Sequence, residues 1–301
     1  MNKGFFLTLL AVYFATVSTA SASNVCYRSD AVRNSLVQVV KKTCSSITAD
    51  DLAHVDVLDL DHSGISSFKP DDFQGLFSLY WLRLGDNYIA SLPAGIFQDL
   101  TSLQNLDLSS NYLASLPTGA FQGLTSLQNL NLASNSIVSL PGDVFNGLTS
   151  LQSLHLTFNH ISSFPENLFK GLNSLQVLEI SSNYISTLPE GIFQGLTSLQ
   201  TLYIGSSPIN SLPAGIFHGL RSLQALYVYR TYINSLPEGI FHDLSSLVDL
   251  GLPNNKISNL SQNVFQLTDL PHISRVDLTG NPLDPVTTSQ LSNQLGSIFV
   301  H

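Results

Sequence analysis

A unit of 24 residues recurs along most of this chain, and no other feature constrains its fold as strongly. One copy, at residues 178–200, reads LEISSNYISTLPEGIFQGLTSLQ. A phenylalanine returns at the same interval nine times in succession, at Phe73, Phe97, Phe121, Phe145, Phe169, Phe193, Phe217, Phe241 and Phe265. This period predicts a solenoid, because one unit is too small to enclose a core and must bury its apolar residues against neighbouring units.

An asparagine marks the same place in most units, which we call the ladder position. It is Asn87, Asn111, Asn135, Asn159, Asn183 and Asn255, it is replaced by Ser63, Ser207 and Thr231, and a tenth unit ends at Asn281 after a two-residue insertion. The amide of a buried asparagine can bond backbone groups that neighbouring strands leave unpaired. Each lost bond of this kind costs on the order of 1–3 kcal/mol.

Before each ladder position, the pattern x-Leu-x-Leu-x alternates between apolar and variable residues. Alternation with a period of two predicts a strand whose leucines point into the core and whose x residues point outward. Proline and glycine follow in most units and predict a turn on the opposite side. Stacking would place all these strands side by side in one parallel sheet.

The repeated motif L-x-L-x-x-N-x-I-x-x-L-P-x-G-x-F-x-G-L-x-S-L-Q resembles the leucine-rich repeat in its typical 24-residue subclass. The LP-x-G-x-F-x-GL-x-SLQ part of this motif is similar to the repeats in the ectodomains of Slit, Toll-like and variable lymphocyte receptors, and to those of secreted bacterial repeat proteins. Those receptors usually close with a cysteine-rich C-terminal cap, whereas no cysteine follows Cys44 here. The helical N-terminal segment looks more like the caps of internalin-type bacterial proteins.

This resemblance implies an α/β solenoid shaped as a curved horseshoe. A parallel β-sheet would line the concave face, turns and short helical segments would form the convex face, and a helical cap would precede the first repeat. The predicted organisation is a signal peptide at residues 1–22, the N-terminal cap at 23–51, ten repeats at 52–283 and a short C-terminal cap at 284–301. Weak helical spacing through Leu291, Leu295 and Phe299 suggests a helix in that last segment.

The first residues have the pattern of a secretory signal peptide. Lys3 gives a positive start, residues 5–17 are mostly apolar, and Ala20-Ser21-Ala22 supplies a small-residue cleavage pattern. No second long apolar run follows. We therefore expect an exported product, extracellular or periplasmic, without membrane insertion.

Two cysteines, Cys26 and Cys44, flank a segment with helical spacing at Val32, Leu36, Val39 and Val40, for which Asp30 is a plausible N-cap. Export makes a Cys26–Cys44 disulfide chemically reasonable, and two buried free thiols are the alternative. Such a bridge would pin the helix over the first strand.

Composition disfavours two classes of partner. The net charge is −9 and only 11% of the residues are charged, whereas nucleic acids and anionic membranes require clustered Lys and Arg. Asn259-Leu260-Ser261 matches an N-glycosylation sequon, which matters only for a eukaryotic source. The sequence leaves the ligand, the source and the oligomeric state open.

Convex and turn positions are nearly copied from unit to unit, while the outward strand positions vary. This variation fits either drift at exposed sites or diversification for binding. Large aromatic residues at these positions favour binding, because Tyr, Trp and Arg dominate recognition hot spots. The residues expected to contact a partner are Trp81, Arg83, His155, Phe158, Glu179, Tyr203, Tyr227, Tyr229, Arg230 and Tyr232.

The units at Ser207 and Thr231 combine a lost ladder asparagine with Tyr203, Tyr227 and Tyr229. We expect these rings to form one patch, with Arg230 at its edge. The alternative is that Ser and Thr are merely serviceable replacements in a degenerate repeat. Aromatic residues also follow the ladder position, at Tyr88, Tyr112, His160, Tyr184 and Tyr232, where they would extend the contact area or pack on the neighbouring turn.

Catalytic and metal-binding patterns are weak. His155 and Glu179 fall on adjacent strands and could pair, and Asp59, Asp61 and Asp86 gather near His62. Neither group comes with a nucleophile motif, a phosphate loop or known ligand spacing, so we expect no enzyme, no metal and no cofactor. The predicted function is recognition of a partner protein by the concave face. Binding of a carbohydrate or cell-envelope glycan by the same aromatic surface, as an adhesin, is the alternative.

Overall fold

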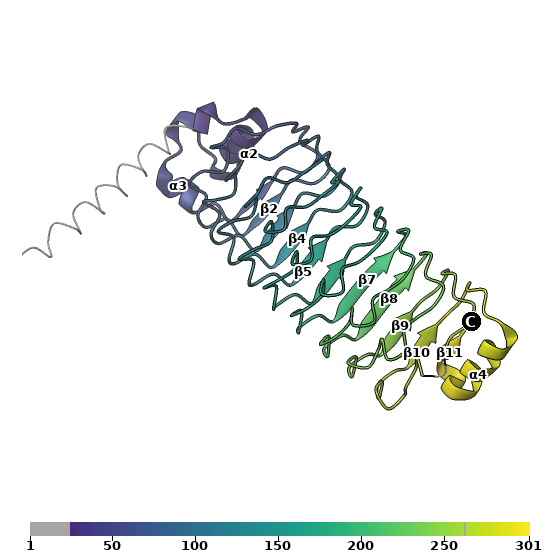
Figure 1. Ribbon diagram of the computed structural model, residues 1–301. Helices are drawn as coiled ribbons and strands as arrows, with labels where there is room; N and C mark the ends of the chain where they lie inside the picture. Colours follow the sequence, from purple (N-terminus) through teal and green to yellow (C-terminus); the bar gives the residue numbers. More distant parts are fainter. Residues whose placement is uncertain (1–24, 262) are drawn as a thin grey trace, which may run out of the picture.

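The computed structural model describes residues 25–261 and 263–301 of this chain, so the predicted signal peptide lies outside the described residues. Its strands form one parallel sheet in sequence order, running side by side along an elongated molecule (Figure 1). They are β1 (Val57–Asp59), β2 (Trp81–Arg83), β3 (Asn105–Asp107), β4 (Asn129–Asn131), β5 (Ser153–His155), β6 (Val177–Glu179), β7 (Thr201–Gly205), β8 (Ala225–Tyr229), β9 (Asp249–Gly251), β10 (Arg275–Asp277) and β11 (Phe299–Val300). The predicted parallel solenoid is confirmed.

The core is one continuous column of leucines, isoleucines and phenylalanines behind the sheet. The nine repeating phenylalanines are at most 2% exposed and stack from repeat to repeat with ring centroids 5.6–6.4 Å apart. In the described chain, turns connect the strands on the convex side, and no helix lies between residues 54 and 284. Because each unit packs only on its neighbours, every repeat presents equivalent positions on the sheet.

The ladder asparagines from Asn87 to Asn255 are buried and bind the backbone as predicted. Asn111 Nδ2 donates to the carbonyls of Leu84 and Leu108, and its Oδ1 accepts from the Ile89 N–H. The residue just before the ladder position has a positive φ in every repeat, for example 52° at Asp86. This left-handed turn, uncommon outside glycine, rotates the chain out of the strand so that the asparagine points inward.

The N-terminal end carries α2 (Asp30–Val40) and α3 (Ala49–Ala53), together with short 3₁₀ turns η1 (Val25–Tyr27) and η2 (Cys44–Ser46). The disulfide between Cys26 and Cys44 is present, as predicted, and joins the segments before and after α2. Two details of the prediction were wrong. Ser29 rather than Asp30 holds the N-cap position, and Val39 is 46% exposed because it lies on the solvent side of the helix.

A buried arginine fastens this end to the first repeat. Arg28 is 1% exposed and donates to the backbone carbonyls of Asp72 and Gln74. The Asp72 carboxylate in turn accepts from the backbone N–H of Ser29 and of Lys69. Burial lowers the pKa of the Arg28 guanidinium, although nearby aspartates oppose that shift.

The C-terminal end carries α4 (Pro285–Leu295), the 3₁₀ turn η3 (Gly296–Ile298) and β11. Asp284 caps α4 by accepting from the Thr287 N–H, while Leu291 and Leu295 are buried. Strand β11 pairs with β10 and so occupies the sheet edge that β10 would otherwise expose. None of the described helices is long and apolar enough to cross a membrane.

Candidate functional site: the outer face of the sheet

Strands β7 and β8 differ from the others because each has five residues instead of three. In the other repeats, the side-chain amide of the ladder asparagine donates to the backbone carbonyl three residues before it. The ladder asparagine of the next repeat usually donates to that same carbonyl. Asn87 and Asn111, for example, share the Leu84 carbonyl. A carbonyl that accepts from these side chains does not accept from the backbone N–H of the neighbouring strand. Backbone pairing between the strands therefore stops after three residues.

Ile204 occupies the equivalent position in the repeat of β7, where Ser207 and Thr231 replace both asparagines. Their hydroxyls bond elsewhere: Ser207 Oγ donates to the Asn183 carbonyl, and Thr231 Oγ1 donates to Asn255 Oδ1. Backbone pairing therefore continues through Ile204↔Val228 and Gly205↔Tyr229. Two successive losses of asparagine have lengthened this pair of strands.

The longer strands carry a group of half-buried rings, Tyr203, Tyr227 and Tyr229, which we call the tyrosine platform. Tyr203 and Tyr227 stack almost parallel, with centroids 4.9 Å apart and planes at 8°. Tyr227 lies over Gly251, where a Cβ would come within 2.5 Å of the ring, and Tyr229 lies over Gly205, where it would come within 2.7 Å. Glycine on the neighbouring strands thus admits each ring to its position.

A polar chain holds the platform from the C-terminal side. The Tyr227 hydroxyl donates to Asp249 Oδ2 over 2.7 Å, and this bond to a carboxylate raises the pKa of Tyr227 to about 12. Arg275 bonds both Asp249, at 3.3 Å, and Asp277, at 2.7 Å. The sequence interpretation missed Asp249 and Arg275, although both precede their ladder asparagines by six residues and could have been found in that column.

Three predicted contact residues, Phe158, Arg230 and Tyr232, lie beyond the strands. Phe158 and Arg230 have φ values of 56° and 51° and belong to the left-handed turn that follows each strand. Placing them among the outward strand residues was wrong, because β5 ends at His155 and β8 ends at Tyr229. Phe158 is 65% exposed, and Tyr232, two residues after Arg230, is 60% exposed.

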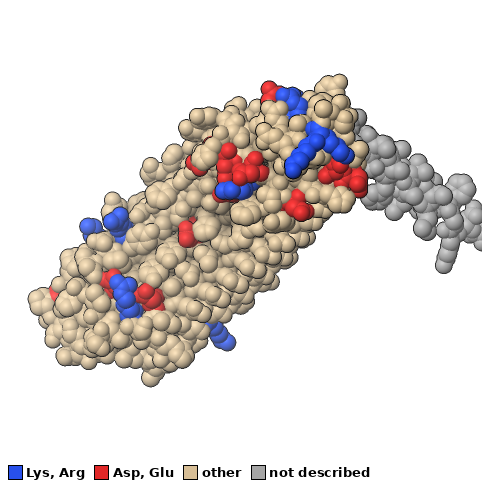
Figure 2. All heavy atoms as spheres, turned by 180° about the vertical axis from the view of Figure 1, so that it is seen from behind, with Lys and Arg blue, Asp and Glu red and all other residues tan. Residues whose placement is uncertain are grey.

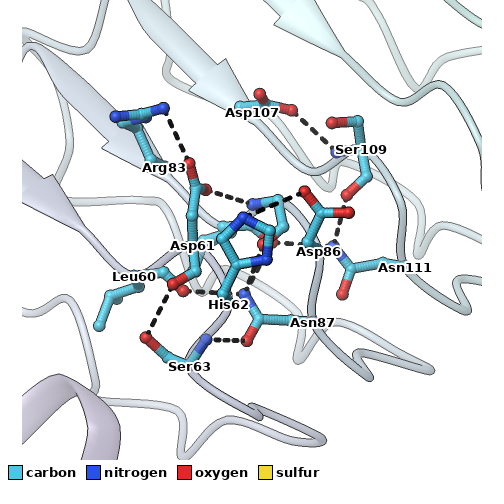
Figure 3. A network of polar contacts seen from close by, with 12 residues as sticks. Leu60, Asp61, His62, Ser63, Arg83, Asp86, Asn87, Asp107, Ser109 and Asn111 are labelled. Carbon is cyan, nitrogen blue, oxygen red and sulfur yellow. Dashed lines mark hydrogen bonds and ion pairs between the residues drawn. The ribbon is translucent and has the colours of Figure 1, made fainter.

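Near the N-terminal end, Arg83 organises a second group on the same face. Its guanidinium lies 3.0 Å from both Asp59 and Asp61 and packs over the Trp81 ring at 5.5 Å. Asp61 also accepts from the Gly85 N–H over 2.7 Å, and desolvation raises its pKa. Figure 3 shows Asp61 turned toward Arg83.

His62 and Asp86 form a separate exposed pair within this group, with His62 Nε2 3.6 Å from Asp86 Oδ2 (Figure 3). Within the described chain, no group of three or more His, Cys, Asp or Glu side chains is arranged to hold a metal ion. The carboxylates of Asp59 and Asp61 already face Arg83 as their counter-ion. The arrangement is an ion-paired surface.

A third group lies at mid-sheet, where His155 Nδ1 is 2.9 Å from Glu179 Oε2 and the His155 Nε2 is 2.8 Å from Ser153 Oγ. The sequence interpretation missed Ser153. A Ser–His–Glu chain also occurs in hydrolases, but acyl transfer requires donors for an oxyanion. Here the backbone N–H groups of Ser153 and Val177 are bound to the carbonyls of Gln128 and Gln152, respectively. The His155–Glu179 pair links β5 to β6.

The structure thus places seven of the ten predicted contact residues in three separate groups along the molecule. Trp81 and Arg83 lie together, His155 and Glu179 lie together, and the three platform tyrosines lie together. Figure 2, which shows the molecule from behind, has charged side chains in small separate clusters on a surface that is mostly uncharged. The three tyrosines are the largest aromatic group on the sheet itself.

Comparison with known proteins agrees with this geometry. The family model described as leucine rich repeat matches residues 77–137, 125–185, 174–230 and 223–283. The comparison with curated protein sequences gave no match.

Among solved structures, the chain is similar to a leucine-rich repeat protein of Leptospira interrogans, with 28% identity and a TM-score of 0.74, covering 84% of this chain and 62% of that one. It is also similar to chains in two structures of the Drosophila Toll–Spatzle complex. The first has 23% identity and a TM-score of 0.74, covering 83% of this chain and 33% of that one, so this likeness shows the fold alone. The second, a glycosylated form, has 25% identity and a TM-score of 0.70, covering 78% and 33%.

Proposed function

Because this chain belongs to the leucine-rich repeat family, we propose that it binds a partner protein through the outer face of its sheet, with the tyrosine platform at the centre of the contact. The fold typically mediates protein–protein recognition, and the Toll neighbours are described as a complex with Spatzle. The present chain spans only part of the length of these neighbours, so its partner is proposed from its own surface.

The observation that carries the proposal is the preorganisation of the rings. Tyr203 and Tyr227 are stacked, Tyr227 is tied to Asp249, and Tyr229 lies against Gly205, so the rings lose little conformational freedom on binding. Tyrosine supplies a large apolar area with a polar end, which is the residue type that dominates hot spots. Asp249 and Arg275, on two further strands, hold this arrangement from the C-terminal side.

An exported location supports this function. The disulfide fits an oxidising compartment, and residues 1–22 match a signal peptide. We propose that the partner is an extracellular or periplasmic protein. We propose that this recognition is non-catalytic, as is typical of leucine-rich repeat modules.

Site-specific photo-crosslinking tests this proposal. A benzophenone amino acid replaces Tyr229 on the platform or, as control, Phe77, which is 51% exposed and lies outside the strands. Both variants are exposed to extracts of the source cells and of cells that it contacts. We expect a discrete protein adduct from position 229 that is absent from position 77 and is reduced by the unlabelled wild-type protein. Equal adducts from both positions, or none from position 229, would contradict the proposal.

A further inference from the structure

A glutamate and a tyrosine lie opposite each other at the N-terminal side of the tyrosine platform, where β6 pairs with β7. Glu179 and Tyr203 are direct partners in this register, and both are half-buried on the outer face. On the other side of the platform, Asp249 has the guanidinium of Arg275 as its counter-ion. Among the described residues, Glu179 pairs only with His155, which is charged only when it is protonated. The carboxylate opposite Tyr203 thus lacks a guanidinium.

The side chains of Glu179 and Tyr203 lean away from each other. Glu179 leans toward β5, because its Oε2 lies 2.9 Å from His155 Nδ1. Tyr227 leans toward β9, where it covers Gly251, and Tyr203 lies parallel to it to within 8°. Tyr203 therefore leans in the same direction and turns one ring face toward Glu179. In the described parts of the chain, Tyr227 is the only ring stacked on Tyr203, and no guanidinium covers the other face.

Another part of the same sheet face shows which group fits between carboxylates and an aromatic ring. Arg83 lies 3.0 Å from both Asp59 and Asp61 and packs over the Trp81 ring at 5.5 Å. A guanidinium is planar, so its N–H groups can bind a carboxylate while its face stacks on a ring, whereas the lysine ammonium is a point charge without such a plane. The net charge of −9 also favours the approach of a basic surface.

We propose that Glu179 and Tyr203 together bind an arginine side chain of the partner protein. This inference rests on the proposed function, since it names the residue that the partner presents beside the platform. The guanidinium donates to the Glu179 carboxylate and stacks on the free face of Tyr203, which extends the stack of Tyr203 on Tyr227 by one more group. Charge-assisted hydrogen bonds and a cation–π contact then act on the same side chain.

NMR titration of the backbone amides tests the proposal with three small probes. They are N-acetylarginine methylamide, the lysine equivalent, and N-acetylcitrulline methylamide, in which a neutral urea replaces the guanidinium. The variants are Glu179→Gln and Tyr203→Leu. The matched control is Glu166→Gln, which changes an exposed glutamate in a turn outside the strands. Thermal unfolding followed by circular dichroism verifies that each variant is folded.

We expect the arginine probe to shift the amide signals of Glu179 and Tyr203 and to bind more tightly than the lysine probe, while the citrulline probe shifts neither signal. Glu179→Gln should weaken binding of the arginine probe by roughly tenfold, because hydrogen bonds to a charged group are lost. Tyr203→Leu should weaken it less, and Glu166→Gln should retain it. No shift with the arginine probe, equal binding of any other probe, or equal weakening by Glu179→Gln and Glu166→Gln would overturn the proposal.

The crosslinking experiment separates this proposal from the proposed function. A benzophenone at position 229 reports contact between the platform and a protein, whichever residue that protein presents. At limiting protein concentration, we expect Glu179→Gln to reduce the yield of the adduct. An adduct that forms equally well in Glu179→Gln would overturn the arginine contact and leave partner binding in place. The absence of an adduct from the protein with native Glu179 would contradict both.

Discussion

The repeats from β2 to β6 and the repeats of β7 and β8 have the same core but end their strands differently. In the first region, each asparagine amide donates to strand carbonyls, as Asn111 does to the Leu84 carbonyl, and the strands have three residues. In the second, Ser207 and Thr231 release the Ile204 carbonyl, and the strands have five. The phenylalanine column passes through both regions with nearly the same spacing.

The ladder residue therefore controls the surface of the sheet as well as the core. The added strand length places Tyr229 on the outer face, opposite Gly205, at a position where the ladder repeats carry small residues such as Gly85 or Ser109. A large ring therefore stands in a regular strand only where the asparagines are missing. The two successive repeats that lack the ladder asparagine are the ones that carry Tyr203, Tyr227 and Tyr229 on the outer face.

The largest expected effect concerns the ladder itself. Asn135→Ala removes the donor to the Leu108 carbonyl and the acceptor for the Leu113 N–H, both buried. We expect a loss of roughly 3 kcal/mol in the free energy of unfolding, since each unsatisfied buried group costs on the order of 1–3 kcal/mol. Urea unfolding followed by circular dichroism measures it.

Ser207→Ala is the matched change in the other region. Ser207 Oγ bonds only the backbone of Asn183, so we expect a loss of about 1 kcal/mol. Equal losses in the two variants would mean that the two regions rely on their ladder residues to the same extent, and the comparison would fail.

The next prediction restores the ladder. In Ser207→Asn/Thr231→Asn, two amides can again reach the Ile204 carbonyl and compete with the pairing of Gly205 and Tyr229. We expect amide hydrogen exchange at Tyr229 to accelerate by roughly tenfold as this terminal pair opens. Ser63→Asn, which adds an amide in the first repeat, is the control and should leave exchange in β8 unchanged. Unaltered exchange in the double variant would show that the ladder does not limit strand length.

The smallest expected effect is a pH dependence confined to the platform. The bond to Asp249 raises the pKa of Tyr227 from 10.0 to about 12, so the neutral phenol is favoured in the folded state. The resulting stabilisation is complete below pH 10 and is lost as the pH rises from 10 to about 12, because the unfolded chain ionises first. Tyr227→Phe should lack this component.

Absorbance at 295 nm, recorded against pH for the wild type and for Tyr227→Phe, checks the titration. The difference between the two curves should be one phenol that ionises at about pH 12. A difference curve centred near pH 10 would show that the Tyr227 hydroxyl is not held by Asp249 in solution.

The sequence alone was sufficient to predict the parallel solenoid, the inward leucines and the buried asparagine ladder. These follow from spacing, because a 24-residue period places the same residue type at the same point of every turn. It also indicated that Tyr203, Tyr227 and Tyr229 would lie together, since equivalent positions of successive repeats are neighbours. It misplaced Phe158 and Arg230, because a left-handed turn after the strand leaves no signature in the pattern when Ser, Phe and Arg all occupy it.

The contacts that these neighbouring residues make could be learned only from the three-dimensional structure. The stacking of Tyr203 on Tyr227, the fit of Tyr229 over Gly205 and the Asp249–Arg275 link depend on rotamers and on small residues across the strand pair. The role of Arg28 and the pairing of β11 with β10 were likewise beyond the sequence, because both join segments outside the repeat. Periodicity specifies which positions are adjacent, whereas the direction of each side chain is set by the packing space that its neighbours leave.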